Sequence, residues 1–297
     1  MYLIKSESLN SGSITFPIPK GSIKDIIIRI TGTNKAGVTL AVGEVGKLRL
    51  TRKGFDIVGN VDFQDLRNIN NYEMGISPFA SAVGAAFSGQ VVVPFHYPQD
   101  ELNILKFLAD EGEFQFVVDP TGLAKMEAGA LMQVFAVFSK GVEKYLRVLL
   151  LTSRVLGASG ATTVHEIMQR NVTQLYIRGG ASDISNAIIT RDNLTLINAA
   201  GAALVELTNQ RGKIETAGTF ILLDFAPTKS PAESISSTMQ LHLTSAAASP
   251  TSVLVVDQML FDAQRTQDSV SSFNRYEAVN VAKDVQASVL KQVASAT

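Results

Sequence analysis

The chain has 297 residues, of which 46% are hydrophobic and 18% charged, with 26 basic and 27 acidic side chains. This composition is typical of a globular chain with one large domain or two smaller ones, and the balanced charge does not favour electrostatic capture of nucleic acid or of an anionic membrane surface. The chain has no cysteine, which excludes disulfides and thiolate metal sites, and no apolar run long enough to predict a transmembrane helix.

Two stretches of the sequence repeat one pattern. Residues 11–32 read SGSITFPIPKGSIKDIIIRITG, and residues 159–180 read SGATTVHEIMQRNVTQLYIRGG. Both open with Ser-Gly, continue through an extended segment, and reach an apolar strand that ends in Ile-Arg, at Ile28-Arg29 and at Ile177-Arg178. A gap of one residue aligns the two stretches, which indicates that the chain contains one unit twice.

Further matches follow in the same order along the chain. The paired segments are 50–58 with 189–197, 88–98 with 217–227, 113–119 with 238–244, and 131–138 with 253–260. The offset between the copies falls from 139 at Thr51 and Thr190 to 125 at Gln115 and Gln240, so the first copy has the longer loops. Because insertions belong in surface loops, this ordered series predicts a tandem duplication.

The matched segments indicate strands joined by turns, because they are short, rich in β-branched and aromatic residues, and bounded by Gly, Pro, Asn and Asp. Short helices are expected at residues 62–70, with a counterpart near 199–208, and at residues 102–108. Long, uneven connections favour a jelly roll over an immunoglobulin sandwich. The predicted fold class is therefore all-β, with two tandem eight-stranded jelly-roll barrels, short loop helices and a C-terminal helix.

Residues 1–140 are expected to form the first jelly roll, residues 141–264 the second, and residues 265–297 a C-terminal amphipathic helix or arm. In this last segment valines repeat at four-residue spacing, which is typical of one face of a helix. The helix is expected either to pack on its own barrel or to contact a neighbouring subunit, and its few mixed charges disfavour a membrane surface. The candidate subunit-contact residues are Phe273, Tyr276, Val281, Val285 and Val289.

No constellation of side chains predicts an enzyme. The histidines, His96, His165 and His242, lie in different segments without His-x-His spacing, and His96 aligns with Phe225, so the metal site of a two-domain cupin is not expected. The sequence also lacks a Gly-x-Ser-x-Gly nucleophile motif and a phosphate-binding loop. The histidines are therefore interpreted as structural, and no catalytic residue, cofactor-binding residue or metal ligand is predicted.

Two other groups of charged residues have a structural and a functional interpretation. The candidate calcium ligands are Asp62 with Asp65, or Asp110 with Glu111 and Glu113, although acidic loop residues are usually solvated surface. Arginines recur at matching places in the two copies, as Arg29 with Arg178 and as Arg52 with Arg191. We interpret them as residues at the barrel ends that cap carbonyl groups or form salt bridges with a loop, rather than as catalytic groups.

The doubled strand order with an enlarged first copy resembles the double jelly-roll major capsid proteins of tailless, membrane-containing icosahedral viruses, of the corticovirus and tectivirus type. The opening segment SGSITFPIPKGSIKDIIIRITG is similar to their N-terminal strand pair, and LTRKGFDIVGNVDFQDLRNI to a strand pair followed by a short helix. The resemblance covers nearly all of residues 1–264, and it rests on architecture because no single motif is diagnostic.

The resemblance implies a structural protein of the virion of such a virus, for example a bacteriophage, made in the host cytoplasm. Three copies would form a nearly hexagonal homotrimeric capsomer that paves an icosahedral shell over an internal membrane. The implied partners are other copies of the chain, minor capsid or vertex proteins and, peripherally, the internal membrane, with no direct contact to nucleic acid. No cofactor is implied, apart from structural calcium.

Two alternatives remain at this point. The first is a carbohydrate-binding or adhesive β-sandwich module of a spike or tail, although the chain has no Trp and only 6 Tyr to form platforms for sugar rings. The second is a metal enzyme on a double barrel, which would need His96 or His242 as a ligand.

Overall fold

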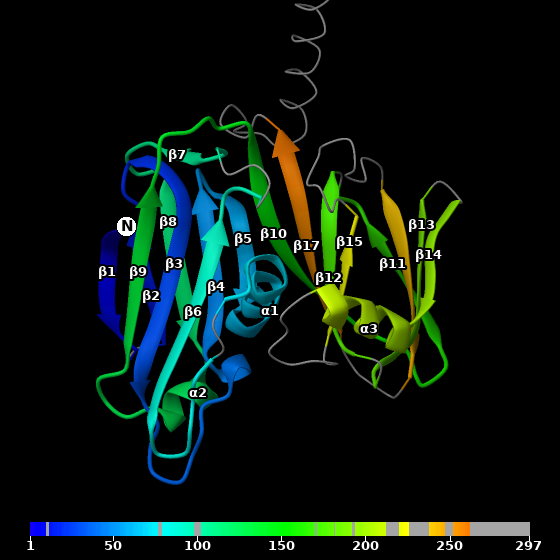
Figure 1. Cartoon of the computed structure of the whole chain (residues 1–297), viewed down its shortest axis with the longest axis horizontal. Coiled ribbons are helices and arrows are strands. Elements are labelled where there is room, and N and C mark those ends of the chain that lie inside the picture. The colour runs from blue at the N-terminus through cyan, green and yellow to red at the C-terminus, as the bar shows by residue number, and fades with distance from the viewer. Residues whose placement is uncertain are drawn as a thin grey trace, which may run out of the picture.

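A computed structural model gives the arrangement of the chain (Figure 1). It describes residues 1–9, 12–76, 79–97, 102–169, 171–180, 182–191, 194–211, 220–225, 238–246 and 252–261. The C-terminal segment, with the candidate contact residues Phe273, Tyr276, Val281, Val285 and Val289, lies outside the described residues.

The first half of the chain forms a barrel from two antiparallel sheets. One, called sheet A, has the order β1-β9-β3-β6, with β7 also paired to β3. Its strands are β1 (Tyr2–Ser8), β3 (Gly21–Thr33), β6 (Ala86–Pro94), β7 (Leu105–Phe107) and β9 (Leu131–Phe138). The opposing strands are β2 (Ser13–Pro17), β4 (Gly46–Arg52), β5 (Phe55–Asp62) and β8 (Gly112–Val118).

The second half repeats this arrangement. The strands β10 (Tyr145–Arg154), β12 (Val172–Arg178), β15 (Phe220–Asp224) and β17 (Ser252–Phe261) form one sheet of the second barrel. The four-stranded sheet β11-β16-β13-β14 forms the other, from β11 (Thr162–Ile167), β13 (Ile184–Arg191), β14 (Leu194–Ala200) and β16 (Met239–Ser245). The described strands therefore confirm two tandem jelly rolls.

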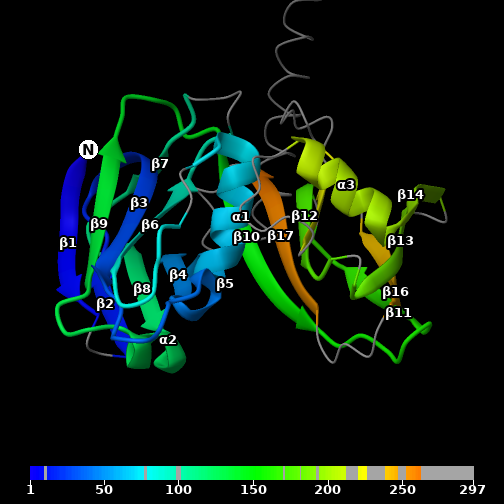
Figure 2. The ribbon, with the colours of Figure 1, turned by 60° about the horizontal axis from the view of Figure 1, so that its bottom comes forward.

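The two barrels share one continuous sheet of eight strands, called sheet B, with the order β15-β12-β17-β10-β5-β4-β8-β2. Its two halves meet where β10 pairs in parallel with β5, with Leu149 opposite Val58 and Leu150 opposite Gly59. The helical elements lie in the connections, as η1 (Val42–Glu44), α1 (Phe63–Met74), α2 (Pro120–Lys125) and α3 (Gly201–Arg211). Figure 2 shows α1 between the barrels and α3 at the corresponding place on the second barrel.

Bulges and turns confirm parts of the sequence alignment residue by residue. The pairing of β3 with β9 shifts between Ile23 and Asp25, and the pairing of β12 with β17 shifts between Val172 and Gln174, at the same offset of 149 that relates Arg29 to Arg178. The β4–β5 and β13–β14 hairpins also share a bulge, which directly precedes Thr51 and Thr190. A bulge at the same place in both copies is expected of duplicated elements, because bulges are conserved features of a fold.

The alignment of the later strands was out of register. The offset of 149 between β3 and β12 makes Tyr176 the equivalent of Ile27. Ile27 pairs with Val92 in β6, and Tyr176 pairs with Leu222 in β15. The strands β6 and β15 are therefore offset by 130 residues, whereas the sequence alignment gives 129. The same comparison gives an offset of 120 for β9 and β17, where the sequence alignment had 122. Thr51 and Thr190 pair with Glu113 and Gln240, so β8 and β16 are offset by 127 residues and Gln115 is not the equivalent of Gln240. Short runs of valine, leucine and isoleucine offer no residue that fixes the register.

The expected helix at residues 102–108 was wrong, because Leu105–Phe107 forms β7 and pairs with β3. Three residues at strand spacing place Leu105 and Phe107 in the core and leave Lys106 outside. The expected helix at residues 62–70 is confirmed as α1, with Phe63, Leu66 and Ile69 buried.

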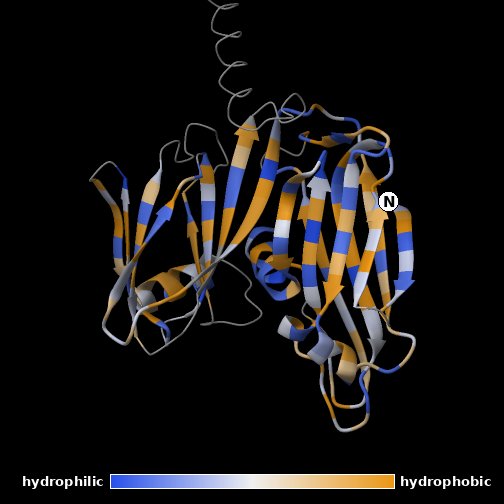
Figure 3. Ribbon diagram, turned by 180° about the vertical axis from the view of Figure 1, so that it is seen from behind, coloured by the Kyte–Doolittle hydropathy of each residue, from blue (hydrophilic) through white to orange (hydrophobic). Residues whose placement is uncertain are grey.

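Hydrophobic and hydrophilic residues alternate along many strands (Figure 3). In β2 the side chains of Ile14 and Phe16 are buried between exposed neighbours, as expected of a strand with one face toward the core. Pro17 ends β2 and Pro94 ends β6, both edge strands, which is where proline costs no ladder hydrogen bond. In the β4–β5 hairpin, Lys53 and Gly54 have positive φ angles of 51° and 77°, as a two-residue turn between twisted strands requires.

A substitution of Gly122 in α2 tests how closely α2 packs against η1 at one end of the first barrel. A Cβ atom at Gly122 would lie 1.8 Å from the backbone oxygen of Glu44 in η1, so the two helices would have to separate. We expect Gly122→Ala to lower the free energy of unfolding by about 1–3 kcal/mol, as overpacking typically does.

The control is Gly12→Ala, because a Cβ atom at Gly12 has no neighbour within 4 Å. Urea denaturation of the two variants measures the difference. Equal stability of the two variants would show that α2 is not held against η1 as described.

Candidate functional site

The junction between the barrels contains several buried polar and charged side chains, and α1 is its central element. One side of α1 packs into the first barrel through Phe63, Leu66 and Ile69. The other side lies against the outer face of sheet B in the second barrel, where Tyr176 and Leu222 join the same hydrophobic cluster. A helix enclosed from both sides needs a partner for each polar group that it buries.

Arg178 supplies such a partner near the start of α1. Its guanidinium group forms ion pairs with the carboxylates of Asp62 and Asp65, and its Nε donates a hydrogen bond of 2.9 Å to Asp65 Oδ1. The Asp65 side chain has no exposed surface, whereas that of Arg178 is 41% exposed. Asn68, one turn after Asp65, donates a hydrogen bond of 2.9 Å to the hydroxyl group of Tyr176.

Arg147 on β10 forms a second charged contact near the end of α1. Its Nη2 lies 2.8 Å from Glu73 Oε1 of α1 and 2.5 Å from Asp257 Oδ2 of β17. Its guanidinium carbon lies 4.7 Å from the centre of the Tyr97 ring, and the Tyr97 hydroxyl donates to Asp257 Oδ1 at 3.0 Å. The side chains of Arg147, Glu73 and Asp257 are at most 2% exposed, so a single buried cation is the partner of two buried carboxylates inside the junction.

The connection between β9 and β10 is also fixed by buried polar side chains. Glu143 accepts a hydrogen bond from Arg52 Nη1 at 2.6 Å and another from the backbone N–H of Lys106 at 3.2 Å. The fully buried Asn103 accepts from the backbone N–H groups of Lys144 and Tyr145. The connection therefore follows one path over the first barrel and delivers β10 to β5.

Burial and the neighbouring charges together set the pKa shifts of the buried ionisable groups. Burial raises the pKa of the Asp65 carboxyl above its ordinary value of 3.8, although Arg178 acts in the opposite direction. Burial also raises the pKa of Glu143 against the effect of Arg52. For Arg147, burial alone would lower the pKa, but the carboxylates of Asp257 and Glu73 raise it well above its ordinary value, so this residue stays charged.

Among the matching arginines, Arg52 forms a salt bridge with a loop residue, as interpreted from the sequence, whereas Arg178 pairs with a helix of the other barrel. Arg52 pairs with Glu143 in the connection and Arg178 pairs with α1, so both have a structural role within the chain. Arg29, the equivalent of Arg178, is exposed on sheet A. The sequence did not indicate the partners of Arg178, because Asp65 and Asn68 look like the solvent face of an amphipathic helix.

The three histidines do not converge. His165 on β11 is buried and points into the second barrel, whereas His242 on the neighbouring β16 lies on the opposite face of that sheet. His96 lies just after β6, with Nδ1 3.2 Å from Asp25 Oδ1. Within the described residues, no group of three or more histidine, aspartate or glutamate side chains is placed to hold a metal ion.

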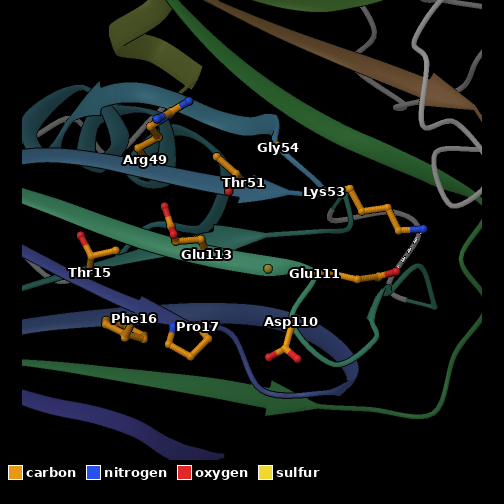
Figure 4. Close-up of a pocket in the computed structure, with 11 residues that line it drawn as sticks. Thr15, Phe16, Pro17, Arg49, Thr51, Lys53, Gly54, Asp110, Glu111 and Glu113 are labelled. Atoms are coloured by element: carbon orange, nitrogen blue, oxygen red, sulfur yellow. Dashed lines mark ion pairs between the residues drawn. The ribbon is translucent and has the colours of Figure 1, made fainter.

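The candidate calcium ligands have other partners or lie apart. Asp62 and Asp65 pair with Arg178, and Glu111 pairs with Lys53 at 3.0 Å. Asp110, Glu111 and Glu113 border an open pocket of about 650 Å³ on the outer face of β2, β8 and β4 (Figure 4). Figure 4 shows Glu111 turned toward Lys53 and Asp110 and Glu113 on separate sides of the pocket. Calcium binding there stays an alternative to the preferred interpretation, a solvated acidic surface.

Comparison with solved structures finds similar folds over nearly the whole chain. The crystal structure of the major capsid protein of STIV has a TM-score of 0.65 and 13% identity, over 91% of this chain and 99% of that one. The major capsid protein P2 of bacteriophage PM2 has a TM-score of 0.64 and 14% identity, over 90% and 97%. A chain in the atomic structure of Sulfolobus turreted icosahedral virus has a TM-score of 0.68 and 13% identity, over 98% and 97%.

Neither protein-family models nor curated proteins match the sequence. At such low identity the likeness establishes the fold, and the similar structures are double jelly-roll major capsid proteins. The class of fold expected from the sequence is therefore confirmed.

Arg147 tests the charge balance of the junction. Replacing it with methionine keeps much of its volume but leaves Glu73 and Asp257 buried without their cation. We expect Arg147→Met to lower the free energy of unfolding by about 3–5 kcal/mol in urea denaturation, as for other broken buried ion pairs.

The matched control is Arg49→Met, because the ion pair of Arg49 with Asp56 is 38% and 35% exposed on its two sides. An exposed pair contributes at most about 1 kcal/mol. Equal losses in the two variants would contradict a special role of Arg147.

Asp65 gives the junction a pH dependence whose sign follows from its raised pKa. As the pH rises above 3.8, the unfolded chain loses the Asp65 proton before the folded chain does, so the contribution of this group to stability falls. The contribution becomes constant once the pH exceeds the pKa of the folded state.

Asp65→Asn removes this titration and serves as the reference. We expect the free energy of unfolding of the wild type minus that of Asp65→Asn to decrease from about pH 4 upward and then to level off. A difference that increases with pH would show that Arg178 outweighs burial at this carboxyl group.

Proposed function

We propose that this chain is a structural capsid protein, and that three copies assemble into a capsomer with a nearly hexagonal outline. The supporting observation is the buried junction, which joins two barrels of the same fold through one shared sheet and the enclosed helix α1. A pair of barrels at a fixed angle is one third of a ring of six, and closed rotational assembly is the usual way in which identical chains complete such a ring.

The likeness to major capsid proteins supports the same proposal over nearly the full length of the chain. On this proposal the protein is located in the virion, has no enzymatic role, and binds mainly to other copies of itself. Contacts with minor capsid or vertex proteins and peripheral contact with an internal membrane belong to the proposal. Within the described part of the chain, no helix has the length and apolar character needed to cross a bilayer.

The C-terminal arm extends the proposal to contacts between subunits. Phe273, Tyr276, Val281, Val285 and Val289 stay predicted contact residues, and the arm is proposed to bind a neighbouring subunit. Assembly in the host cytoplasm, absence of direct nucleic-acid contact and absence of a required cofactor complete the proposal.

The mass of the purified full-length protein tests the trimer. Three chains of 31.8 kDa give about 95 kDa, which native mass spectrometry and light scattering both resolve from a single chain. We expect the trimer to dominate at micromolar concentration, and negative-stain electron microscopy to show particles with a hexagonal outline.

A stable monomer at high concentration, with both termini intact, would contradict the proposal. Binding to a glycan array that depends on exposed aromatic residues would instead support the carbohydrate-binding alternative, and an array without binding is the result expected here.

A further inference from the structure

The outer faces of the two equivalent sheets carry the same kind of side-chain row. In the second barrel, Leu151, Val255, Tyr176 and Leu222 lie opposite one another across β10, β17, β12 and β15. All four belong to or pack on the hydrophobic cluster that includes α1. This row therefore packs against the first barrel, whose helix α1 contacts β12.

The equivalent row on sheet A consists of Leu3, Phe135, Ile27 and Val92, across β1, β9, β3 and β6. Leu3 is 44% exposed, and Ile27 and Phe135 are partly exposed, whereas Val92 at the α1 side of the row is buried. Neither α1 nor α3 is drawn across this sheet in Figure 1. Leu3, Phe135 and Ile27 thus have the apolar character of a covered face without a helix such as the one that packs on the counterpart row.

The helices α1 and α3 are equivalent at the level of single hydrogen bonds. The side chain of Asn70 in α1 accepts from the backbone N–H of Val92, and Thr208 in α3 accepts from the N–H of Leu222. Val92 and Leu222 are equivalent by strand register, so the helices are related by an offset of 138 residues. This offset makes Ala203 the counterpart of Asp65 and Glu206 the counterpart of Asn68.

The two helices differ in what surrounds them. Asp65 and Asn68 are buried against the second barrel, whereas Ala203 and Glu206 are exposed. Ala202 is also exposed, and Leu207 is 43% exposed. The face of α3 that corresponds to the junction face of α1 is therefore exposed, and its side chains are small or partly apolar.

From these equivalences we propose that α3 of one copy packs on the outer face of sheet A of a second copy, across the row Leu3, Phe135, Ile27 and Val92. The contact repeats between chains the α1 junction that exists within each chain. It deepens the proposed function, on which it rests, by naming the two surfaces that join one subunit to the next.

Charge complementarity supports the second copy as the occupant. Arg178 pairs with the carboxylate of Asp65 within the chain, and its counterpart Arg29 is an exposed cation on sheet A. The helix that would cover Arg29 has alanine at the position of Asp65, but one turn further on the same face it carries the carboxylate of Glu206. An Arg29–Glu206 pair between chains would take the place of the Arg178–Asp65 pair within the chain.

The contact joins different surfaces of two identical chains, so each copy donates one helix and receives another. Such a head-to-tail contact closes into a ring when its rotation permits. Three copies would then contain six helix-on-sheet junctions, three within chains and three between them.

Charge reversal tests the proposed pair. At a concentration where the unmodified chain is trimeric, we expect Arg29→Glu and Glu206→Arg each to cause loss of trimer in native mass spectrometry, because each puts like charges together. The double variant Arg29→Glu with Glu206→Arg restores opposite charges and is expected to recover the trimer. The control Lys47→Glu reverses an exposed charge on β4, away from both surfaces, and is expected to remain trimeric.

Cross-linking tests the same contact without changing the charged pair. The chain has no cysteine, so Gln90→Cys on sheet A and Ala203→Cys on α3 introduce the only thiols. A short bismaleimide is expected to produce covalent species of two and three chains and none larger, whereas Lys47→Cys with Ala203→Cys is expected to stay uncross-linked.

The outcomes separate the two proposals. A trimer that is indifferent to both charge reversals and forms no cross-link through Gln90→Cys and Ala203→Cys would overturn this contact and leave the proposed function standing. An unmodified chain that forms no trimer would overturn the proposed function and this contact together.

Discussion

The enclosure of α1 is the constraint on which the rest of the structure depends. The helix carries Asp65 and Glu73 into a junction with little access to water, and each carboxylate is met by an arginine of the second barrel, Arg178 or Arg147. A buried charge without its counter-charge is costly, so these contacts restrict the junction to geometries that keep both pairs. The hydrophobic contacts hold the two barrels together, and the ion pairs fix how the barrels are placed relative to each other.

This constraint explains why equivalent strands are buried to different degrees. All residues of β12 except Arg178 are buried, because one of its faces lines the second barrel and the other receives α1. The equivalent β3 alternates between buried and more exposed residues, because only its inner face is covered within the chain. The two equivalent strands therefore have different environments, and β12 has Tyr176, which meets α1, where β3 has Ile27.

Much of the fold could be predicted from the sequence, because the turns and bulges left signals that do not depend on partners far away. The Thr-Arg hairpins and the Ile-Arg strands aligned correctly. The register of β6 could not be fixed, since consecutive apolar residues fit either face of a strand. The registers of β8 and β9 were wrong by two residues, a shift that keeps each side chain on the same face and leaves the hydrophobic pattern unchanged. The sequence predicts a helix at residues 102–108, because a strand of three residues is too short to show the alternation of buried and exposed residues.

The junction itself was beyond the reach of sequence patterns. Asp65 and Asn68 have the spacing of a solvated helix face, and only the placement of a second barrel turns that face inward. Asn103 and Glu143 likewise gain their roles from the path of the connection between the barrels. Polar residues at an interface between domains resemble surface residues until both partners are in place.

A cryo-electron microscopy map of the assembled particle, at a resolution that shows side chains, tests the proposed assembly most directly. We expect a ring of six barrels from three chains, with α1 and α3 in equivalent positions and α3 of each chain over Ile27 and Phe135 of the next. A map in which sheet A faces solvent, or is covered by another element, would contradict it.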